Sequence, residues 1–125
     1  MTKHVITLEW TSPPLSLNDR HDRWTHAKIV DSIRLAAGWL AKAARLGRYT
    51  HVTVTLHYRP RDGRRRDADN LVATLKPLCD GLVDAGLVTD DDPVRMSKRM
   101  PEIHPPSPKP LMWLEIETSE GGLYP

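Results

Sequence analysis

The sequence predicts an α+β domain in which two helices lie on one face of a small mixed β-sheet. Apolar residues alternate in four short segments, and they recur every three or four residues in two longer segments. These segments follow the order β-α-β-α-β-β, for which two helices on one sheet face are the economical arrangement. The 125 residues suffice for one domain, residues 1–125, of which 119–125 are expected to form a loose tail.

The first half of the chain is expected to supply two strands and one helix. Alternation from His4 to Trp10 predicts the first strand, which ends before Pro13. Apolar residues at helical spacing predict a helix from about Thr25 to Leu46, with Gly47 as its stop. The clearest alternation runs from Thr50 to Tyr58 and predicts the second strand.

The second helix is expected to run from about Asn70 to Ala85 and to end at Gly86. Pro77 lies inside this segment and has no backbone N–H, so it is expected to kink or split the helix near Thr74. The apolar stripe that predicts the helix is made of leucines at helical intervals, namely Leu71, Leu75, Leu78 and Leu82.

Two more strands are expected towards the C-terminus. The first spans Val94 to Ile103 and is expected to turn Val94, Met96 and Met100 inward. The second spans Leu111 to Thr118, and its alternation places Met112, Leu114 and Ile116 on one face.

Charge is distributed unevenly along a chain whose net charge is only +2. A basic patch near an acidic run suits a protein that grips phosphate and holds a metal, whereas a solvated loop is the plainer interpretation. The acidic run is Asp90 to Asp92. The polar stretch from Leu15 to His26 is either a connector or a lid that contacts DNA or covers the active site. The basic patch consists of Arg59, Arg61, Arg64, Arg65 and Arg66.

Composition excludes several classes of protein. The single cysteine, Cys79, rules out an internal disulfide framework and a cysteine-based zinc site. No apolar run approaches the ~20 residues of a membrane span, so we expect a soluble, cytoplasmic protein without a membrane partner.

A small chain without Phe gains stability from a shared surface, which favours a homodimer. The outward face of the strand from Thr50 to Tyr58 and Trp113 are the candidate interfaces.

Asp67 and Asp69 are the strongest candidates for chemistry. Carboxylates separated by one residue point the same way on an extended backbone, and they can then share a hard cation. The alternative is that Asp69 or Asn70 caps the following helix, which would leave Asp67 unexplained. One aspartate of the run from Asp90 to Asp92 is a candidate third ligand, and a solvated turn is its alternative.

At this point the chain resembles a known family. The run from Arg64 to Leu71, then a helix, then the run from Asp84 to Asp91 resembles the RusA-type Holliday junction resolvases, which are common in phages and prophages. The Pro13-Pro14 pair, Asn18, Arg20 and the Thr25-His26 pair resemble the N-terminal region of that family. The resemblance covers the chain from His4 to about Met100.

The resemblance implies a homodimeric endonuclease that needs Mg²⁺, with Mn²⁺ as the alternative ion, and that resolves four-way DNA junctions in recombination and repair. Asp67, Asp69 and Asp91 would be its metal-binding, catalytic carboxylates. A functional lysine of the family falls on Ala73 here, and Lys76, one turn further along, is its expected substitute. Other hypotheses are a flap or single-strand nuclease and a non-catalytic DNA-binding module. The expected DNA-binding residues are Arg20, Arg61, Arg64, Arg65, Arg66 and Asn70.

Overall fold

The computed structural model describes residues 2–118, so the predicted loose tail at 119–125 lies outside the described residues. The described chain forms a mixed five-stranded sheet and two α-helices, which confirms the predicted α+β class. The elements are β1 (Thr2–Thr7), α1 (Arg23–Ala43), β2 (Val52–Arg59), the 3₁₀ turn η1 (Ala68–Leu71), α2 (Val72–Asp84), β3 (Met96–Lys98), β4 (Glu102–Ile103) and β5 (Leu111–Thr118).

The sheet has the strand order β1-β5-β2-β3, and the short strand β4 also pairs with β2. β5 is antiparallel to both β1 and β2, whereas β3 and β4 run parallel to β2. Leu114 of β5 lies between Ile6 of β1 and Leu56 of β2, and all three side chains are buried. The predicted bounds of the last strand, Leu111 to Thr118, are confirmed.

The predicted single strand from Val94 to Ile103 is wrong, because this segment forms two short strands. Pro101 lies between them and has no N–H to donate to β2. Met96 is buried as expected, but Val94 is 79% exposed and Met100 is 60% exposed. Val94 lies in the turn before β3 and Met100 in the gap between β3 and β4, so neither follows the alternation of a strand.

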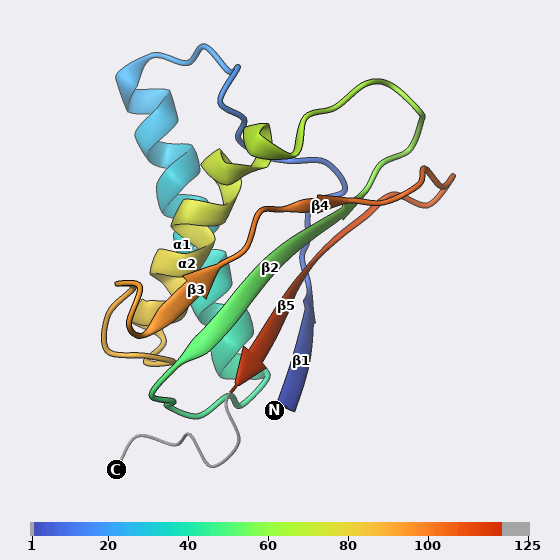
Figure 1. Ribbon diagram of the computed structural model, residues 1–125. Helices are drawn as coiled ribbons and strands as arrows, with labels where there is room; N and C mark the ends of the chain where they lie inside the picture. Colours follow the sequence, from blue (N-terminus) through green and yellow to red (C-terminus); the bar gives the residue numbers. More distant parts are fainter. Residues whose placement is uncertain (1, 119–125) are drawn as a thin grey trace.

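Both helices cover one face of the sheet, and the core lies between the two layers (Figure 1). Because side chains alternate along a strand, every second residue of β2 and β5 points into this core and the others point to the opposite face. We call the helix-covered side the core face and the other side the open face. The inward residues of β2 are Val52, Val54, Leu56 and Tyr58.

Helix α1 begins and ends earlier than its sequence pattern predicts. Asp22 caps its N-terminus by accepting a hydrogen bond from the Thr25 backbone N–H at 2.8 Å. Its last residue is Ala43, so Gly47 is not the stop. Arg45 takes a left-handed conformation with φ of 56°, and this turn ends the helix before the glycine is reached.

Helix α2 runs through Pro77 without a split, so the predicted split near Thr74 is wrong. The 3₁₀ turn η1 passes directly into α2 at Val72. Gly86 follows the helix with a φ of 90°, and its N–H donates to the Val83 carbonyl at 2.9 Å. On the side towards α1, a Cβ on Gly81 would lie 2.2 Å from the Arg34 carbonyl oxygen, so the two helices pack too closely there for any side chain.

Candidate functional site

A cavity of about 320 Å³ opens beside the arginine-rich loop that joins β2 to η1. The N-terminal polar loop forms one wall: the Leu17 N–H donates to the Asn70 carbonyl at 3.3 Å, and the Thr74 hydroxyl donates to the Leu15 carbonyl at 2.6 Å. This loop therefore contributes Pro13, Ser16 and Asn18 to the cavity lining. The residues that line the cavity are Pro13, Ser16, Asn18, Tyr58, Arg65, Arg66, Asp67, Asn70, Leu71 and Ile103.

Arg66 shapes the loop that borders the cavity. Its guanidinium donates to the backbone carbonyl of Asp62 at 2.8 Å and to the carboxylate of Asp62 at 2.9 Å, and it lies 5.8 Å from the centre of the Tyr58 ring. The hydrogen bond from Arg66 lowers the pKa of Asp62, helped by the Arg64 backbone N–H. Arg66 therefore uses its charge inside the protein, which makes it less available to a phosphate than a fully exposed arginine.

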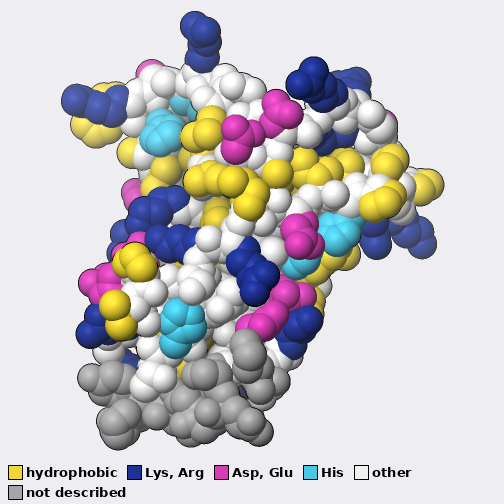
Figure 2. All heavy atoms as spheres, in the orientation of Figure 1, with side chains coloured by type: hydrophobic (Ala, Val, Ile, Leu, Met, Phe, Trp, Pro, Cys, Tyr) yellow, Lys and Arg dark blue, Asp and Glu magenta, His cyan; other side chains and the backbone are white. Residues whose placement is uncertain are grey.

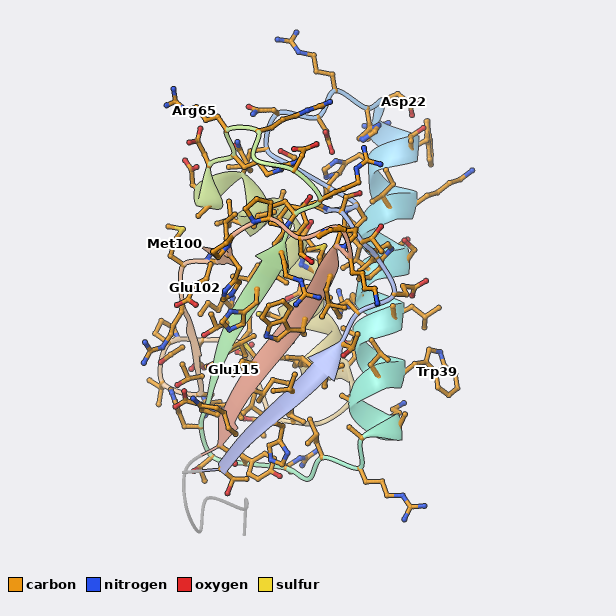
Figure 3. All side chains as sticks on the ribbon, turned by 90° about the vertical axis from the view of Figure 1, so that its right-hand side faces the viewer. Asp22, Trp39, Arg65, Met100, Glu102 and Glu115 are labelled. Carbon is orange, nitrogen blue, oxygen red and sulfur yellow. The ribbon has the colours of Figure 1, made fainter. Side chains whose placement is uncertain are left out.

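The other predicted DNA-binding arginines lie at the surface. Arg61 and Arg64 line a second hollow of about 230 Å³ that shares Tyr58 and Arg66 with the first cavity. Arg65 is exposed and points away from the sheet (Figure 3), and Arg20 is exposed in the N-terminal loop. On one face of the molecule, an apolar band is bordered by basic, acidic and His side chains (Figure 2).

Asp67 lines the cavity, and its backbone is extended, with φ of −104° and ψ of 130°. Asp69 is exposed two residues on, inside η1, so the prediction that one extended backbone carries both carboxylates is wrong. The capping alternative for Asp69 and Asn70 is wrong. Within residues 2–118, α2 has Leu71 as its N-cap and receives no side-chain capping bond, and Asp67 makes none to η1.

Asp91 lies between two lysines. Its Oδ2 atom accepts hydrogen bonds from Lys76 Nζ at 2.7 Å and from Lys98 Nζ at 2.9 Å. These bonds, first from Lys76 and then from Lys98, hold the pKa of the Asp91 carboxyl well below its usual range. The same contact raises the pKa of Lys76, which also bonds Asp80 at 3.0 Å. The structure thus brings together Lys76 and Asp91, two of the residues singled out from the sequence.

The neighbours of Asp91 have local roles in the turn. The Asp90 carboxylate accepts from the Asp91 backbone N–H at 2.7 Å, and Asp92 accepts from the N–H groups of Val94 and Arg95 at 3.0 and 3.1 Å. Asp91 is therefore the aspartate of this run whose side chain reaches another element. Lys98 was missed in the sequence; its position two residues after the inward Met96 was the available signal.

A second cluster lies on the open face of the sheet, where His57, Glu102 and His104 could hold a metal ion. Their nearest ligand atoms all lie within 4.8 Å of one another, whereas Asp67, Asp69 and Asp91 form no such group of three in the described part of the chain. The sequence pattern did not single out His57 as a metal ligand. The spacing of Glu102 and His104, with one residue between them, was a signal for a shared strand face.

Burial distinguishes this cluster from ordinary surface histidines. The His57 side chain is 8% exposed, and burial lowers its pKa, so the neutral imidazole is favoured. Its ring stacks on Trp113, with ring centres 5.0 Å apart. Trp113, one of the predicted dimer contacts, is therefore already packed within its own chain.

No protein-family model matches this chain, and no curated protein matches it. None of the helices in the described part of the chain has both the length and the apolar character needed to cross a membrane.

Proposed function

We propose that this chain is a metal-dependent endonuclease that cuts branched DNA, as its resemblance to the RusA-type resolvases implies. The observation that carries the proposal is the cavity beside the arginine loop. There an aspartate, Asp67, which makes no capping bond within residues 2–118, lies among Arg65, Arg66 and Asn70. A carboxylate on the wall of an arginine-lined hollow suits a site that meets a phosphodiester and a cation together.

The exposed arginines supply the sequence-independent part of DNA binding. Arg64 is 81% exposed in its side chain, and Arg61 and Arg65 are exposed on the same loop. Arginine guanidinium groups bind phosphate through two parallel hydrogen bonds, and each contact releases counterions. The loop would therefore hold the DNA backbone above the cavity, and Arg66 would keep the loop in shape.

Asp67, Asp69 and Asp91 are the residues proposed to hold Mg²⁺, or Mn²⁺ in its place. Because they form no group at ligand distance within residues 2–118, the loop of Asp67 and the turn of Asp91 would have to approach each other when the ion binds. Carboxylate oxygens are the ligands these hard ions prefer, and the lowered pKa of Asp91 keeps that group ionised. A bound Mg²⁺ would activate water and relieve charge on the phosphate. Asp91 would have to exchange its lysine contacts for the metal, and the Lys76 ammonium group, freed from Asp91, would then face the developing negative charge.

The test is a panel of labelled DNA substrates: a four-way junction, a flap, a single strand and a linear duplex, each with and without Mg²⁺. We expect Mg²⁺-dependent cleavage with preference for the junction. Preference for the flap or the single strand would support a different nuclease on this fold. Binding without cleavage of any substrate, with Mg²⁺ or Mn²⁺, would make the chain a DNA-binding module and overturn the proposal.

A homodimer completes the proposal, because a four-way junction has two-fold symmetry and resolution needs two symmetric nicks. Light scattering should give twice the mass of one chain. Wild-type protein mixed with an excess of Asp69→Asn chains should form heterodimers that nick a junction once without resolving it. A stable monomer that makes paired cuts in one binding event would contradict this part of the proposal.

A further inference from the structure

The cluster of His57, Glu102 and His104 is separate from the proposed nuclease site. His57 pairs with Glu102 across β2 and β4, and the next pair in the register is Tyr58 with Ile103. Tyr58 and Ile103 line the cavity beside the arginine loop. Because neighbouring residues of a strand point to opposite faces, the three cluster residues lie on the open face, behind the wall of that cavity.

The distances within the cluster are close to those of a metal-ligand set. His57 Nδ1 and His104 Nε2 are joined by a hydrogen bond of 2.8 Å, and His57 Nδ1 lies 3.3 Å from the nearer oxygen of Glu102. A bound metal ion would replace the proton of that hydrogen bond. Ligands bound at 2.0–2.1 Å in a tetrahedron are separated by roughly 3.3 Å. Glu102 therefore already lies at that separation from His57, and His104 has to move only about 0.5 Å, by the same tetrahedral estimate.

The far side of the His57 ring supports the same assignment. His57 Nε2 is a buried side-chain nitrogen that has no hydrogen-bond partner within residues 2–118. The nearest carboxylate oxygen, on Glu115 of β5, is 3.8 Å away. Histidines that bind metals usually donate their second ring N–H to a carboxylate, which fixes the tautomer and leaves the other nitrogen free for the ion. A small movement of Glu115 would complete this arrangement, with Nε2 protonated and Nδ1 free. Figure 3 shows Glu102 and Glu115 on the sheet, well apart from Trp39 on α1.

We propose that His57, Glu102 and His104 form a binding site for a zinc-like transition-metal ion, distinct from the site for Mg²⁺. Two imidazoles with one carboxylate suit zinc, cobalt or nickel, whereas magnesium prefers oxygen ligands. Three protein ligands leave a fourth position open, and the 59% exposed side chain of Glu102 gives the site access to solvent.

The ion would clamp β4 onto β2. β4 spans only Glu102–Ile103 and follows an interruption at Pro101, so few backbone hydrogen bonds hold it. Two of the three ligands flank Ile103, which forms part of the cavity wall. Metal binding on the open face would therefore restrict the movement of Ile103 in the cavity wall.

The test is calorimetric titration of the full, untagged chain with Zn²⁺. We expect one Zn²⁺ per chain, with no competition from millimolar Mg²⁺, and visible absorption typical of four-coordinate Co²⁺ when that ion replaces zinc. Loss of an outer-shell partner typically weakens metal binding about 10- to 100-fold, so Glu102→Gln or His104→Gln should weaken it at least ~100-fold. Glu115→Gln should weaken it by roughly 10-fold.

Glu117→Gln and His26→Gln are the matched controls, since they remove the same groups outside the cluster, and both should bind Zn²⁺ as the wild type does. At a hundredfold excess over the dissociation constant, Zn²⁺ should raise the Tm of the wild type by roughly 10 °C, and it should leave Glu102→Gln unchanged. Circular dichroism of each variant checks that it folds. Equal affinity in the wild type and in the two ligand variants, or displacement of Zn²⁺ by Mg²⁺ at similar concentration, would overturn the proposal.

Discussion

The two regions that carry the candidate carboxylates, the loop around Asp67 and the turn around Asp91, differ in how their charge is balanced. Asp67 lies on a cavity wall near arginines, one of which, Arg66, is bound to Asp62. Asp91 is held between Lys76 and Lys98 at hydrogen-bond distance. The comparison shows that one residue type can be open to a ligand in one place and internally neutralised in another. On our proposal, a metal ion therefore has to compete with lysines at Asp91 but not at Asp67.

The largest expected effect comes from the Asp67 side of the comparison. Replacing both Asp67 and Asp69 with asparagine should reduce Mg²⁺-dependent junction cleavage at least ~100-fold, because the loss of a metal ligand costs more than the loss of its outer shell. Junction binding, measured by gel shift, should remain close to wild type. Asp31→Asn, on the exposed surface of α1, is the control. Normal cleavage by the double variant would remove these aspartates from the site.

Lys76 and Lys98 should respond differently, although both bind Asp91. Lys76→Ala should lower the maximal cleavage rate by roughly 10- to 100-fold, because it removes a donor proposed to face the developing charge. Lys98→Ala should leave the maximal rate alone and lower the Mg²⁺ concentration for half-maximal cleavage ~5-fold, as expected when a competing charge of ~1 kcal/mol is lost. Mg²⁺ titrations of the cleavage rate give both quantities. If the two variants behave alike, the lysines have no separate roles.

Arg65 and Arg66 make a matched pair within the loop. Arg66→Ala should destabilise the protein by about 1–2 kcal/mol in urea unfolding, because it removes charged hydrogen bonds to Asp62. Arg65→Ala should change stability by less than ~0.5 kcal/mol but reduce the slope of log affinity against log salt by ~0.9. The triple variant Arg61→Ala, Arg64→Ala, Arg65→Ala should reduce that slope further. An unchanged slope in the triple variant would place the loop away from DNA.

The smallest expected effect concerns a carboxylate outside both regions. Asp84 on α2 bonds Arg34 on α1 through two hydrogen bonds, at 2.5 and 2.8 Å, and the bond from Arg34 lowers the pKa of Asp84. A lowered folded pKa gives stability that is present above the unfolded pKa of ~3.9 and is lost as pH falls through the folded value. Because both groups are about half exposed, Asp84→Asn should cost less than ~1 kcal/mol at neutral pH. A stability difference between wild type and variant that shrinks as pH falls below ~3.9 checks the sign.

Local patterns predicted much of the fold. The alternation of Met112, Leu114 and Ile116 gives β5 its observed bounds, and the leucine stripe of α2 is buried. Helix ends were harder to predict, because the stop of α1 depends on the left-handed turn at Arg45 and not on the nearest glycine. Alternation over a few residues was enough to locate a strand, but it did not indicate which residue would turn the chain out of a helix.

The candidate site was less accessible to sequence reasoning. The motif around Asp67 singled out Asp67, Lys76 and Asp91, but the contact between Lys76 and Asp91 was not predicted. For Lys98 and the cluster on the open face, strand alternation gives only the face on which each residue lies, because their contacts arise when β3 and β4 pair in parallel with β2. Such pairings join residues far apart in sequence, and their register is not written in local periodicity.

The central claim is that Asp67 and Asp91 serve one metal-dependent active site despite their different surroundings. Single-turnover cleavage of a four-way junction by the wild type, Asp67→Asn, Asp91→Asn and the double variant tests it most directly. Residues that act as a unit are strongly non-additive. We therefore predict that each single variant loses nearly all Mg²⁺-dependent activity and that the double variant is no worse. An Asp91→Asn variant that cuts at the wild-type rate would contradict the claim.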